Sequence, residues 1–218
     1  MKYSTVIFDL DGTLLDTSKG IITCARYTAD KMGFPDLTNN QQRNFIGPPI
    51  LDSFMREYGI SESKARDVVE IYRKRYKEIG LYEASHYDRV IGLLTILKDN
   101  KCKLAVATLK RDDFAKEILR HYELSGFFNF IKGIDAKDTL SKSDILLMCL
   151  KELEQTDLSK VILIGDSIYD SIGAEQIGID FLAVTYGYGF RNKNDANKSR
   201  NVFIAENADD ILNYFNLL

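Results

Sequence analysis

The hydrophobic pattern of the chain is a series of short, uninterrupted apolar runs, each of which ends at polar residues. A run of this length favours a strand that is buried on both faces of a parallel sheet. Four segments have this pattern and a fifth has it more weakly. The four are residues 3–10, 103–107, 161–164 and 181–185, and the fifth is 127–131.

Segments with apolar residues at helical spacing alternate with the later strands. In residues 112–122, Phe114, Ile118 and Tyr122 fall on one face of a helix, and residues 143–153 repeat the pattern. Strands that alternate with helices of this size indicate crossover units, and right-handed crossovers place helices on both faces of the sheet. The pattern therefore predicts an α/β fold, a Rossmann-like parallel sheet with helices on both faces.

One interval of about ninety residues, between the first two strands, breaks this alternation. It contains no comparable strand run. Thr17 or Ser18 can cap a first helix there, and Ser61 can cap the last. An insertion of this length is too helical to be a loop, so we expect an all-helical cap domain at residues 17–83 and a core domain made of residues 1–16 and 84–218. The four helical segments of the interval are residues 18–31, 39–45, 50–58 and 61–79.

Three further segments complete the expected order of elements. Residues 89–98 have the pattern of a crossover helix that returns the chain to the sheet, and residues 208–215 have that of a final helix. The tract 191–200 is polar and irregular, which predicts an exposed loop.

Composition narrows the classes of function. The chain has 218 residues, a formal charge of −3 and a pI near 5.5, so it carries no basic footprint for nucleic acid. No stretch approaches the ~20 apolar residues that a membrane span needs, and no secretory signal is visible at the N-terminus. Cys24, Cys102 and Cys149 form no CxxC pair and fit reduced packing residues in the cytoplasm.

Polar residues of particular kinds follow the predicted strands. Because ligands bind at the carboxyl ends of the strands in open parallel sheets, we expect these side chains to meet at one edge. Four carboxylates at one edge would repel one another unless a divalent cation held them, and oxygen ligands beside a phosphate favour Mg²⁺. The residues are Asp9, Asp11, Thr108, Lys142, Asp166 and Asp170.

The spacing assigns a chemistry to each group. Residues two apart in an extended strand end point the same way, so Asp9 and Asp11 can both face the site. One can act as a nucleophile while the other handles the proton of the leaving oxygen. Thr108 offers its hydroxyl and the neighbouring N–H of Leu109 to phosphoryl oxygens, and Lys142 offers a fixed positive charge. Taken singly, each residue has a structural explanation, such as a turn, a helix cap or a surface lysine; their joint placement carries the interpretation.

The run from Asp9 to Thr17, DLDGTLLDT, resembles the first signature of the haloacid dehalogenase superfamily of phosphohydrolases. Thr108, Lys142 and the run GDSIYD at 165–170 match its later motifs in order. The resemblance implies that Asp9 is the nucleophile and a metal ligand. It also implies that Asp11 is the acid/base and a metal ligand through its carbonyl. Asp166 and Asp170 complete the Mg²⁺ shell, and Gly12, Thr108, Leu109 and Lys142 hold the phosphate.

Finer resemblance points to the phosphoglycolate phosphatase and 5′-nucleotidase-like group. It rests on FIGPP at 45–49, on Tyr72-Arg73 and GLYE at 80–83, and on YGYG at 186–189. The chain departs from that group at Leu109, where Asn or Ser is usual, and at Asp88-Arg89, where Pro-Gly is usual. Pro49 is usual in only part of the group.

Cap residues are candidates for reading the rest of the substrate. Gly47-Pro48 forms a stiff loop, and Arg43, Arg73 and Tyr76 can meet a carboxylate or a base; packing and surface roles stay open for each. A cap that closes over the sheet edge would also exclude water.

These observations predict a Mg²⁺-dependent phosphatase that hydrolyses a small phosphorylated metabolite, such as phosphoglycolate or a nucleoside monophosphate, through an aspartyl-phosphate. A phosphomutase of the β-phosphoglucomutase type is the first alternative, and a non-catalytic regulatory protein on the same fold is the second. We expect a cytoplasmic monomer or weak dimer with no nucleic-acid or membrane partner.

Overall fold

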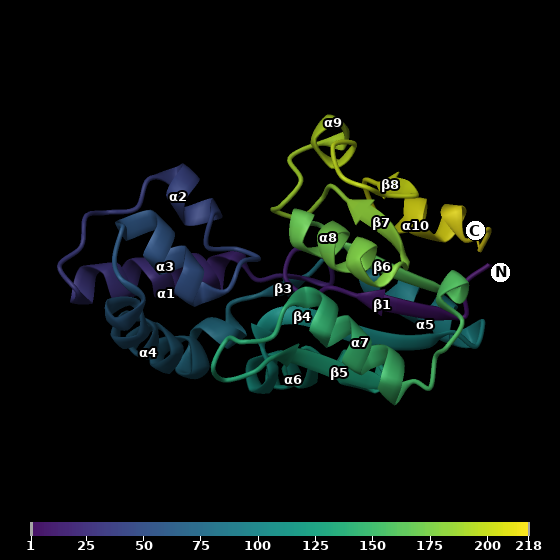
Figure 1. Cartoon of the computed structure of the whole chain (residues 1–218), viewed down its shortest axis with the longest axis horizontal. Coiled ribbons are helices and arrows are strands. Elements are labelled where there is room, and N and C mark those ends of the chain that lie inside the picture. Colours follow the sequence, from purple (N-terminus) through teal and green to yellow (C-terminus); the bar gives the residue numbers. More distant parts are fainter. Residues whose placement is uncertain (1, 218) are drawn as a thin grey trace.

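A computed structural model describes residues 2–217 of the chain, which form a six-stranded parallel sheet with strand order β5-β4-β1-β6-β7-β8 (Figure 1). This arrangement confirms the predicted α/β fold. Central strands β1 and β6 are wholly buried, as expected of uninterrupted apolar runs. The strands are β1 (Thr5–Phe8), β4 (Lys103–Arg111), β5 (Phe130–Ile134), β6 (Val161–Gly165), β7 (Asp180–Val184) and β8 (Phe203–Ala205).

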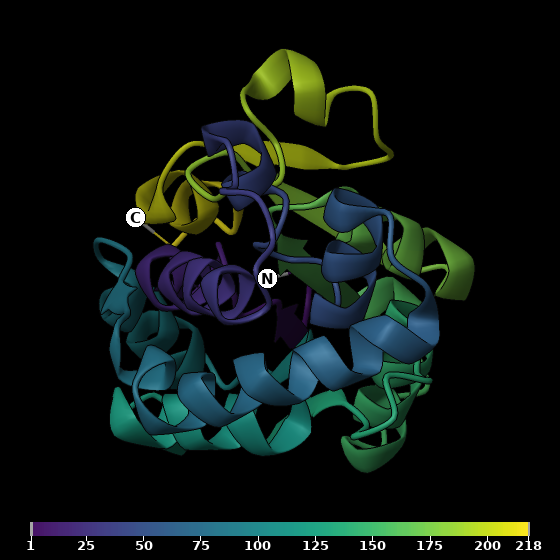
Figure 2. The ribbon, with the colours of Figure 1, turned by 90° about the vertical axis from the view of Figure 1, so that its left-hand side faces the viewer.

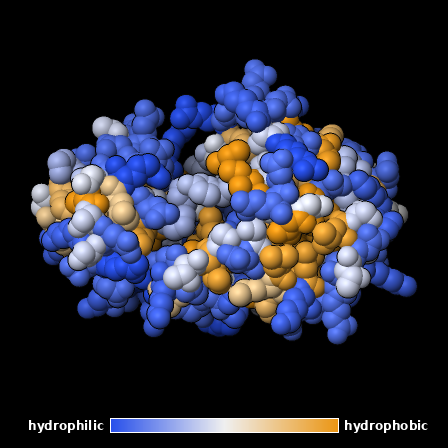
Figure 3. Space-filling view, viewed as in Figure 1, coloured by the Kyte–Doolittle hydropathy of each residue, from blue (hydrophilic) through white to orange (hydrophobic). Residues whose placement is uncertain are grey.

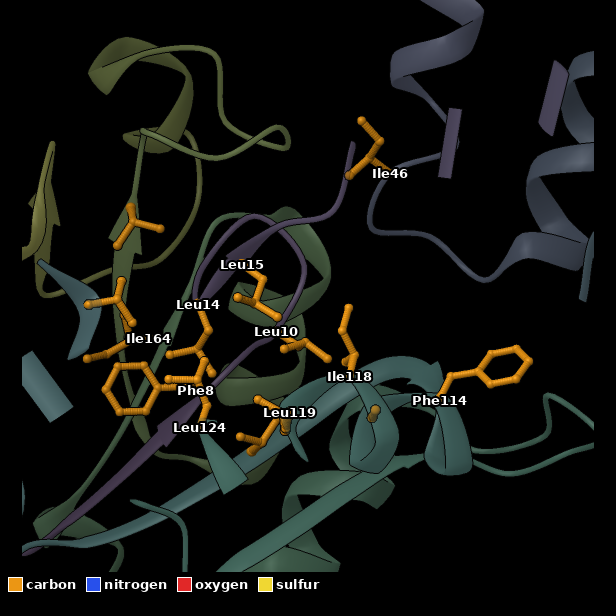
Figure 4. Packing of buried hydrophobic residues seen from close by; sticks show 14 of the residues in the cluster. Phe8, Leu10, Leu14, Leu15, Ile46, Phe114, Ile118, Leu119, Leu124 and Ile164 are labelled. Carbon is orange, nitrogen blue, oxygen red and sulfur yellow. The ribbon is translucent and has the colours of Figure 1, made fainter. Parts of the chain in front are cut away.

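Helices cover both faces of the sheet, and each face has its own apolar core. On one face Phe8 and Ile164 pack with Leu119 and Leu124 beneath the loop that follows β1 (Figure 4). Alternate residues of the same strands, such as Ile7 and Leu163, face the other core. The first face carries α5 (Val90–Asp99), α6 (Asp112–His121) and α10 (Ala208–Tyr214), and the second carries α7 (Lys142–Glu152) and α8 (Ile168–Ile177).

Most of the interval between β1 and β4, up to η1, forms a group of helices beyond the carboxyl end of β1, here called the cap, and α5 follows it on the sheet (Figures 1 and 2). In the cap, Phe54 packs against Phe45, Tyr58 and Tyr72. A two-stranded antiparallel ribbon, β2 with β3, joins cap and core. The elements are β2 (Leu15–Asp16), α1 (Ser18–Lys31), α2 (Asn39–Arg43), α3 (Ile50–Tyr58), α4 (Glu62–Glu78), η1 (Gly80–Tyr82) and β3 (Ser85–His86).

Several details differ from the sequence predictions. The weak fifth strand begins at Phe130, because residues before it form the turn η2 (Ser125–Phe127). The polar tract 191–200 contains a short helix, α9 (Lys193–Ala196), which Asn192 caps through its side chain. Strands β2, β3 and β8 have two or three residues each, too few to show an apolar pattern. A further turn, η3 (Leu158–Lys160), precedes β6.

The surface is largely polar, and apolar side chains gather over α7 and α8 (Figure 3). Leu147, Met148, Ile168 and Ile172 are exposed there. The same view shows a hollow between the cap and the core. Within residues 2–217, the helices are all too short or too polar to cross a bilayer.

Candidate active site

The six polar residues predicted to meet at the sheet edge do lie there, and all are buried. Asp9 and Asp11 follow β1, Thr108 is in the end of β4, and Asp166 follows β6. Asp170 lies in the first turn of α8, and Lys142 is the first residue of α7 rather than a residue before that helix. Neighbouring parallel strands therefore deliver four of the groups to one place, and the first turns of α7 and α8 deliver the other two.

Lys142 joins two of the carboxylates. Its Nζ donates to Asp9 Oδ1 at 2.6 Å and to the Ala107 carbonyl at 2.6 Å, and it lies 2.6 Å from Asp170 Oδ1. Burial disfavours the charged form of Lys142, but the two carboxylates outweigh burial and raise its pKa. The ammonium therefore stays charged between the two acids.

The carboxylate of Asp166 is held by backbone donors. Oδ2 accepts the N–H of Tyr188 at 2.7 Å and of Gly189 at 3.0 Å. A Cβ at Gly12, whose φ is 85°, or at Gly187 would collide with Oδ2, so both positions require glycine. Burial and Asp170 raise the pKa of Asp166 to about 7, and the two N–H donors act in the opposite direction.

Three carboxylates form a set that could hold a cation: Asp9, Asp166 and Asp170 each offer an oxygen within 4.8 Å of the others. Burial is the largest cause of the raised pKa of Asp9; Lys142 opposes it, and Asp170 and Asp166 reinforce it. Asp170 Oδ1, although close to Lys142 Nζ, receives no directed hydrogen bond from residues 2–217. An oxygen-only set with an unused lone pair and excess negative charge fits a hard divalent cation.

Asp11 points to a different set of partners. Its Oδ1 accepts the hydroxyl of Thr17 at 2.6 Å, and Lys110 Nζ lies 2.8 and 3.0 Å from its two oxygens. Thr17, which with Ser18 was expected as a possible cap of α1, stands at the N-cap position, but its hydroxyl bonds to Asp11 and makes no capping bond. Lys110 was not among the predicted site residues. Its position two residues after Thr108 on the same strand was the available signal, because such residues share a face.

Thr108 and Leu109 lie at the end of β4 beside this pair. Thr108 Oγ1 accepts the N–H of Lys110 at 3.1 Å, within the part of β4 where the register with β5 shifts. Leu109 is half-buried and contributes to the wall of a cavity between core and cap. The apolar side chain of Leu109 offers a phosphate no polar contact beyond its backbone.

The structure separates the five cap candidates. Gly47, Pro48, Arg73 and Tyr76 line a small cavity of about 50 Å³ that also contains Asp11. Arg43 lies elsewhere, in a groove of about 690 Å³ that borders Asp166. Gly47 and Pro48 line this groove too, so their loop separates the two spaces.

Arg73 is engaged in an ion pair between cap and core. Its Nη2 lies 2.6 Å from Asp138 Oδ2, with 11% of the Arg73 side chain and 7% of the Asp138 side chain exposed. Asp138 lies in the segment between β5 and α7. The pair therefore ties α4 to the core at the edge of the cavity.

Comparison with known proteins places this site in a family. The model of the family described as haloacid dehalogenase-like hydrolase matches residues 6–184. A 5′-nucleotidase of Pseudomonas aeruginosa is 34% identical over 189 residues, covering 87% of this chain and 86% of that protein. Tyrosine-protein kinase PtkA of Mycobacterium tuberculosis is 33% identical over 207 residues, covering 94% and 70%. A phosphoglycolate phosphatase of Aquifex aeolicus is 27% identical over 183 residues, covering 84% and 85%.

A solved structure agrees with these matches. The crystal structure of a predicted phosphatase from Clostridium acetobutylicum superposes with a TM-score of 0.92 and 32% identity over 100% of both chains. The chain belongs to the haloacid dehalogenase-like hydrolases, as its motifs indicated. Within that family it is a phosphatase, a hydrolase of phosphoric monoesters.

Proposed function

We propose that this phosphatase requires Mg²⁺ and hydrolyses a small phosphorylated metabolite through an aspartyl-phosphate at Asp9. The observation that carries the proposal is the buried cluster of Asp9, Lys142, Asp166 and Asp170, with Asp11 two residues from Asp9. A cluster of this kind brings together a nucleophile, a charge for the phosphoryl group and a set of oxygen ligands.

In this proposal, Lys142 bonds to Asp9 Oδ1, which leaves Oδ2 to attack the phosphorus atom. Asp11 donates a proton to the leaving oxygen and then takes a proton from the water that hydrolyses the intermediate. Thr108 and the backbone N–H of Leu109 hold phosphoryl oxygens. The N–H of Gly12, which was expected to help, already donates to the Leu15 carbonyl at 2.9 Å. Asp9, Asp166, Asp170 and the Asp11 carbonyl would hold Mg²⁺, which supplies positive charge between the carboxylates and the phosphate.

The other two functions have less support. A phosphomutase must hold a bisphosphate, but the cations that line the cavity beside Asp11 are already paired: Lys110 with Asp11, Arg73 with Asp138 and Arg111 with Asp113. A non-catalytic protein has no physical need for buried carboxylates that repel one another. Conversion of glucose 1-phosphate to the 6-phosphate would reveal the mutase, and ATP-dependent tyrosine phosphorylation would reveal an activity of the kind that PtkA is named for.

The test is hydrolysis of p-nitrophenyl phosphate and of a panel of phosphate monoesters, ranked by kcat/KM. We expect EDTA to stop turnover and Mg²⁺ to restore it. Asp9→Asn should retain less than ~1% of the activity, because loss of a covalent nucleophile costs orders of magnitude. Asp67→Asn, an exposed substitution on α4, serves as the control. Metal-independent turnover, or an active Asp9→Asn enzyme, would contradict the mechanism.

Two further expectations belong to this proposal. The three cysteines are buried and free, which supports a reducing compartment such as the cytoplasm. A monomer or weak dimer is proposed as the state in solution. Sedimentation of the wild type against Leu147→Lys, in the exposed apolar area on α7, tests whether that area joins two copies.

A further inference from the structure

The exposed apolar area over α7 and α8 contains five large apolar side chains (Figure 3). Such side chains are normal on a protein surface when they occur singly, whereas a group of them on adjacent helices marks an interaction surface. The two helices lie close together because Gly173 of α8 fits against Lys142 of α7, where a Cβ would collide with the lysine side chain. The five residues are Leu147, Met148, Ile168, Tyr169 and Ile172.

Four exposed residues form one stripe along α7. Leu147 and Met148 lie at its centre, and Asp144 and Lys151 lie at its two ends. Residues that follow the first by three, four and seven positions share one face of a helix, here about 10 Å long. The side of α7 that carries Lys142 is the buried one, so the stripe faces away from the sheet.

The stripe carries opposite charges at equal distances from its centre. Asp144 precedes Leu147 by three residues, and Lys151 follows Met148 by three. The N-terminal cap of α7 uses Oδ2 of Asp144 as the acceptor for Ser141. These bonds hold the pKa of Asp144 below its ordinary value, so the carboxylate is charged at neutral pH. The stripe is therefore apolar between one negative end and one positive end.

A second copy of the chain matches this pattern. In a two-fold symmetric contact, residue i of one copy meets residue j of the other, and j meets i. If the two α7 helices are antiparallel, with the two-fold axis between positions 147 and 148, Leu147 meets the partner's Met148. In the same register Asp144 meets the partner's Lys151, once at each end. One stripe thus supplies both halves of an apolar centre and of two ion pairs.

The charges also select the orientation. In the antiparallel register Glu152, the last residue of α7, falls opposite the partner's Ser143, which is neutral. A parallel arrangement would instead bring Asp144 against the partner's Asp144, and Lys151 against the partner's Lys151. Like charges placed together at a contact oppose association. The antiparallel arrangement is therefore the one that the sequence of α7 favours.

We propose that the α7 stripe joins two copies of this chain in an antiparallel, two-fold contact. Leu147 and Met148 form its centre, an Asp144–Lys151 pair forms each end, and the exposed apolar side chains of α8 adjoin it. Since the contact is small, we expect a weak dimer with a Kd on the order of 10 µM. The contact lies on the side of α7 away from Lys142, so it is independent of the proposed phosphatase chemistry.

The experiment uses two charge reversals, Lys151→Glu and Asp144→Lys, in sedimentation of the full chain at concentrations that span this Kd. Each variant places like charges together at both ends of the contact, so each should weaken self-association about tenfold or more. A mixture of the two variants has an attractive pair at both ends, so it should associate about as tightly as the wild type. Lys74→Glu, an exposed change on α4 in the cap, is the control and should associate like the wild type.

The mixture distinguishes this contact from other modes of association. A wild type that stays monomeric overturns the proposal and assigns the apolar area to a different occupant. A dimer that Lys151→Glu does not weaken also overturns it, as do two folded variants that stay monomeric when mixed. Turnover of p-nitrophenyl phosphate by the same variants tests the proposed function separately, and its absence would leave the contact unaffected.

A second test is needed because Asp144→Lys removes a cap of α7 and can unfold the helix. Met148→Cys places a thiol next to the two-fold axis, and the three native cysteines are buried. Under mild oxidation this variant should form a disulfide-linked dimer. Asp67→Cys, exposed on α4, should form one much more slowly. Equal rates of crosslinking in the two variants would overturn the proposal.

Discussion

The charged groups of the catalytic edge and those of the cap are organised in opposite ways. At the edge, Lys142 bonds to Asp9 and lies beside Asp170 from a third element, and all three side chains are buried. In the cap, pairs such as Arg66–Glu62 lie within one helix and are exposed. Buried pairs are sensitive to loss of one partner, whereas exposed pairs contribute little. We therefore expect substitutions of charged groups at the edge to have large effects. Substitutions of the exposed pairs of the cap should have small ones.

Some cap side chains depart from this pattern, and Arg73 and Tyr76 are examples that reach across to the core. Both line the cavity beside Asp11. The contrast teaches that the cap is held to the edge by buried contacts that join two elements, unlike its exposed pairs.

The largest effect is expected from Lys142→Met. This change leaves Asp9 and Asp170 without the cation that lies between them, and it removes the charge that is proposed to face the phosphoryl group. We expect kcat/KM for p-nitrophenyl phosphate to fall about a thousandfold. Lys137→Met, an exposed lysine of the preceding loop, should retain wild-type activity. A loss of less than about tenfold in Lys142→Met would show that the edge is less sensitive than its burial implies.

Mg²⁺ and pH should both change the stability of the fold, and Asp166 should couple the two effects. The pKa of Asp166 is about 7 in the fold and lower in the unfolded chain, so the folded state binds the extra proton between these values. Stability of the metal-free protein should therefore fall as pH rises from about 4 to 7.

Mg²⁺ binds the deprotonated carboxylates, so it should stabilise the fold more at pH 8 than at pH 5.5. At a hundredfold excess over Kd the gain is about 2.7 kcal/mol, or roughly 5–10 °C in Tm for a chain of this size. Thermal unfolding with and without Mg²⁺ measures the gain. In Asp166→Asn, the stabilisation by Mg²⁺ should differ much less between pH 8 and pH 5.5. If that difference is unchanged, groups other than Asp166 cause it.

Arg73→Met tests the contact between cap and core. It leaves Asp138 nearly buried and unpaired, which should cost about 1–3 kcal/mol in the free energy of unfolding. We also expect KM to rise more than kcat falls, because the cavity wall loosens. Arg66→Met, on the same helix but exposed, should cost less than ~0.5 kcal/mol. If denaturant unfolding shows the same loss of stability for Arg73→Met and Arg66→Met, the ion pair between cap and core contributes no more than a pair within one helix.

The smallest effect concerns Arg89, a residue with a side chain whose φ is 59°. A side chain costs about 1 kcal/mol in this left-handed region. Arg89 also forms an exposed ion pair with Asp209 at 2.8 Å. Since Arg89→Ala and Arg89→Gly both lose the pair, the glycine variant should be about 1 kcal/mol more stable than the alanine variant. No difference between them would mean that the backbone relaxes without strain.

Most of the core was predictable because its signals are local. Uninterrupted apolar runs located β1, β4, β6 and β7, and the polar residues after them located Asp9 and Asp166. The short strands β2, β3 and β8 were not predictable, because two or three residues show no periodic pattern of apolar positions. Roles that depend on a partner far along the chain, such as Lys110 beside Asp11, were also hidden.

The sequence by itself determined the family, the parallel sheet and the order in which acidic and basic residues reach the sheet edge, because burial and strand periodicity act over a few neighbouring residues. Tertiary structure alone decided which groups pair: that Thr17 serves Asp11 instead of capping α1, that Arg73 meets Asp138, and that Arg43 lies apart from the cavity. Those choices depend on distances between elements, which are set when the cap packs against the core.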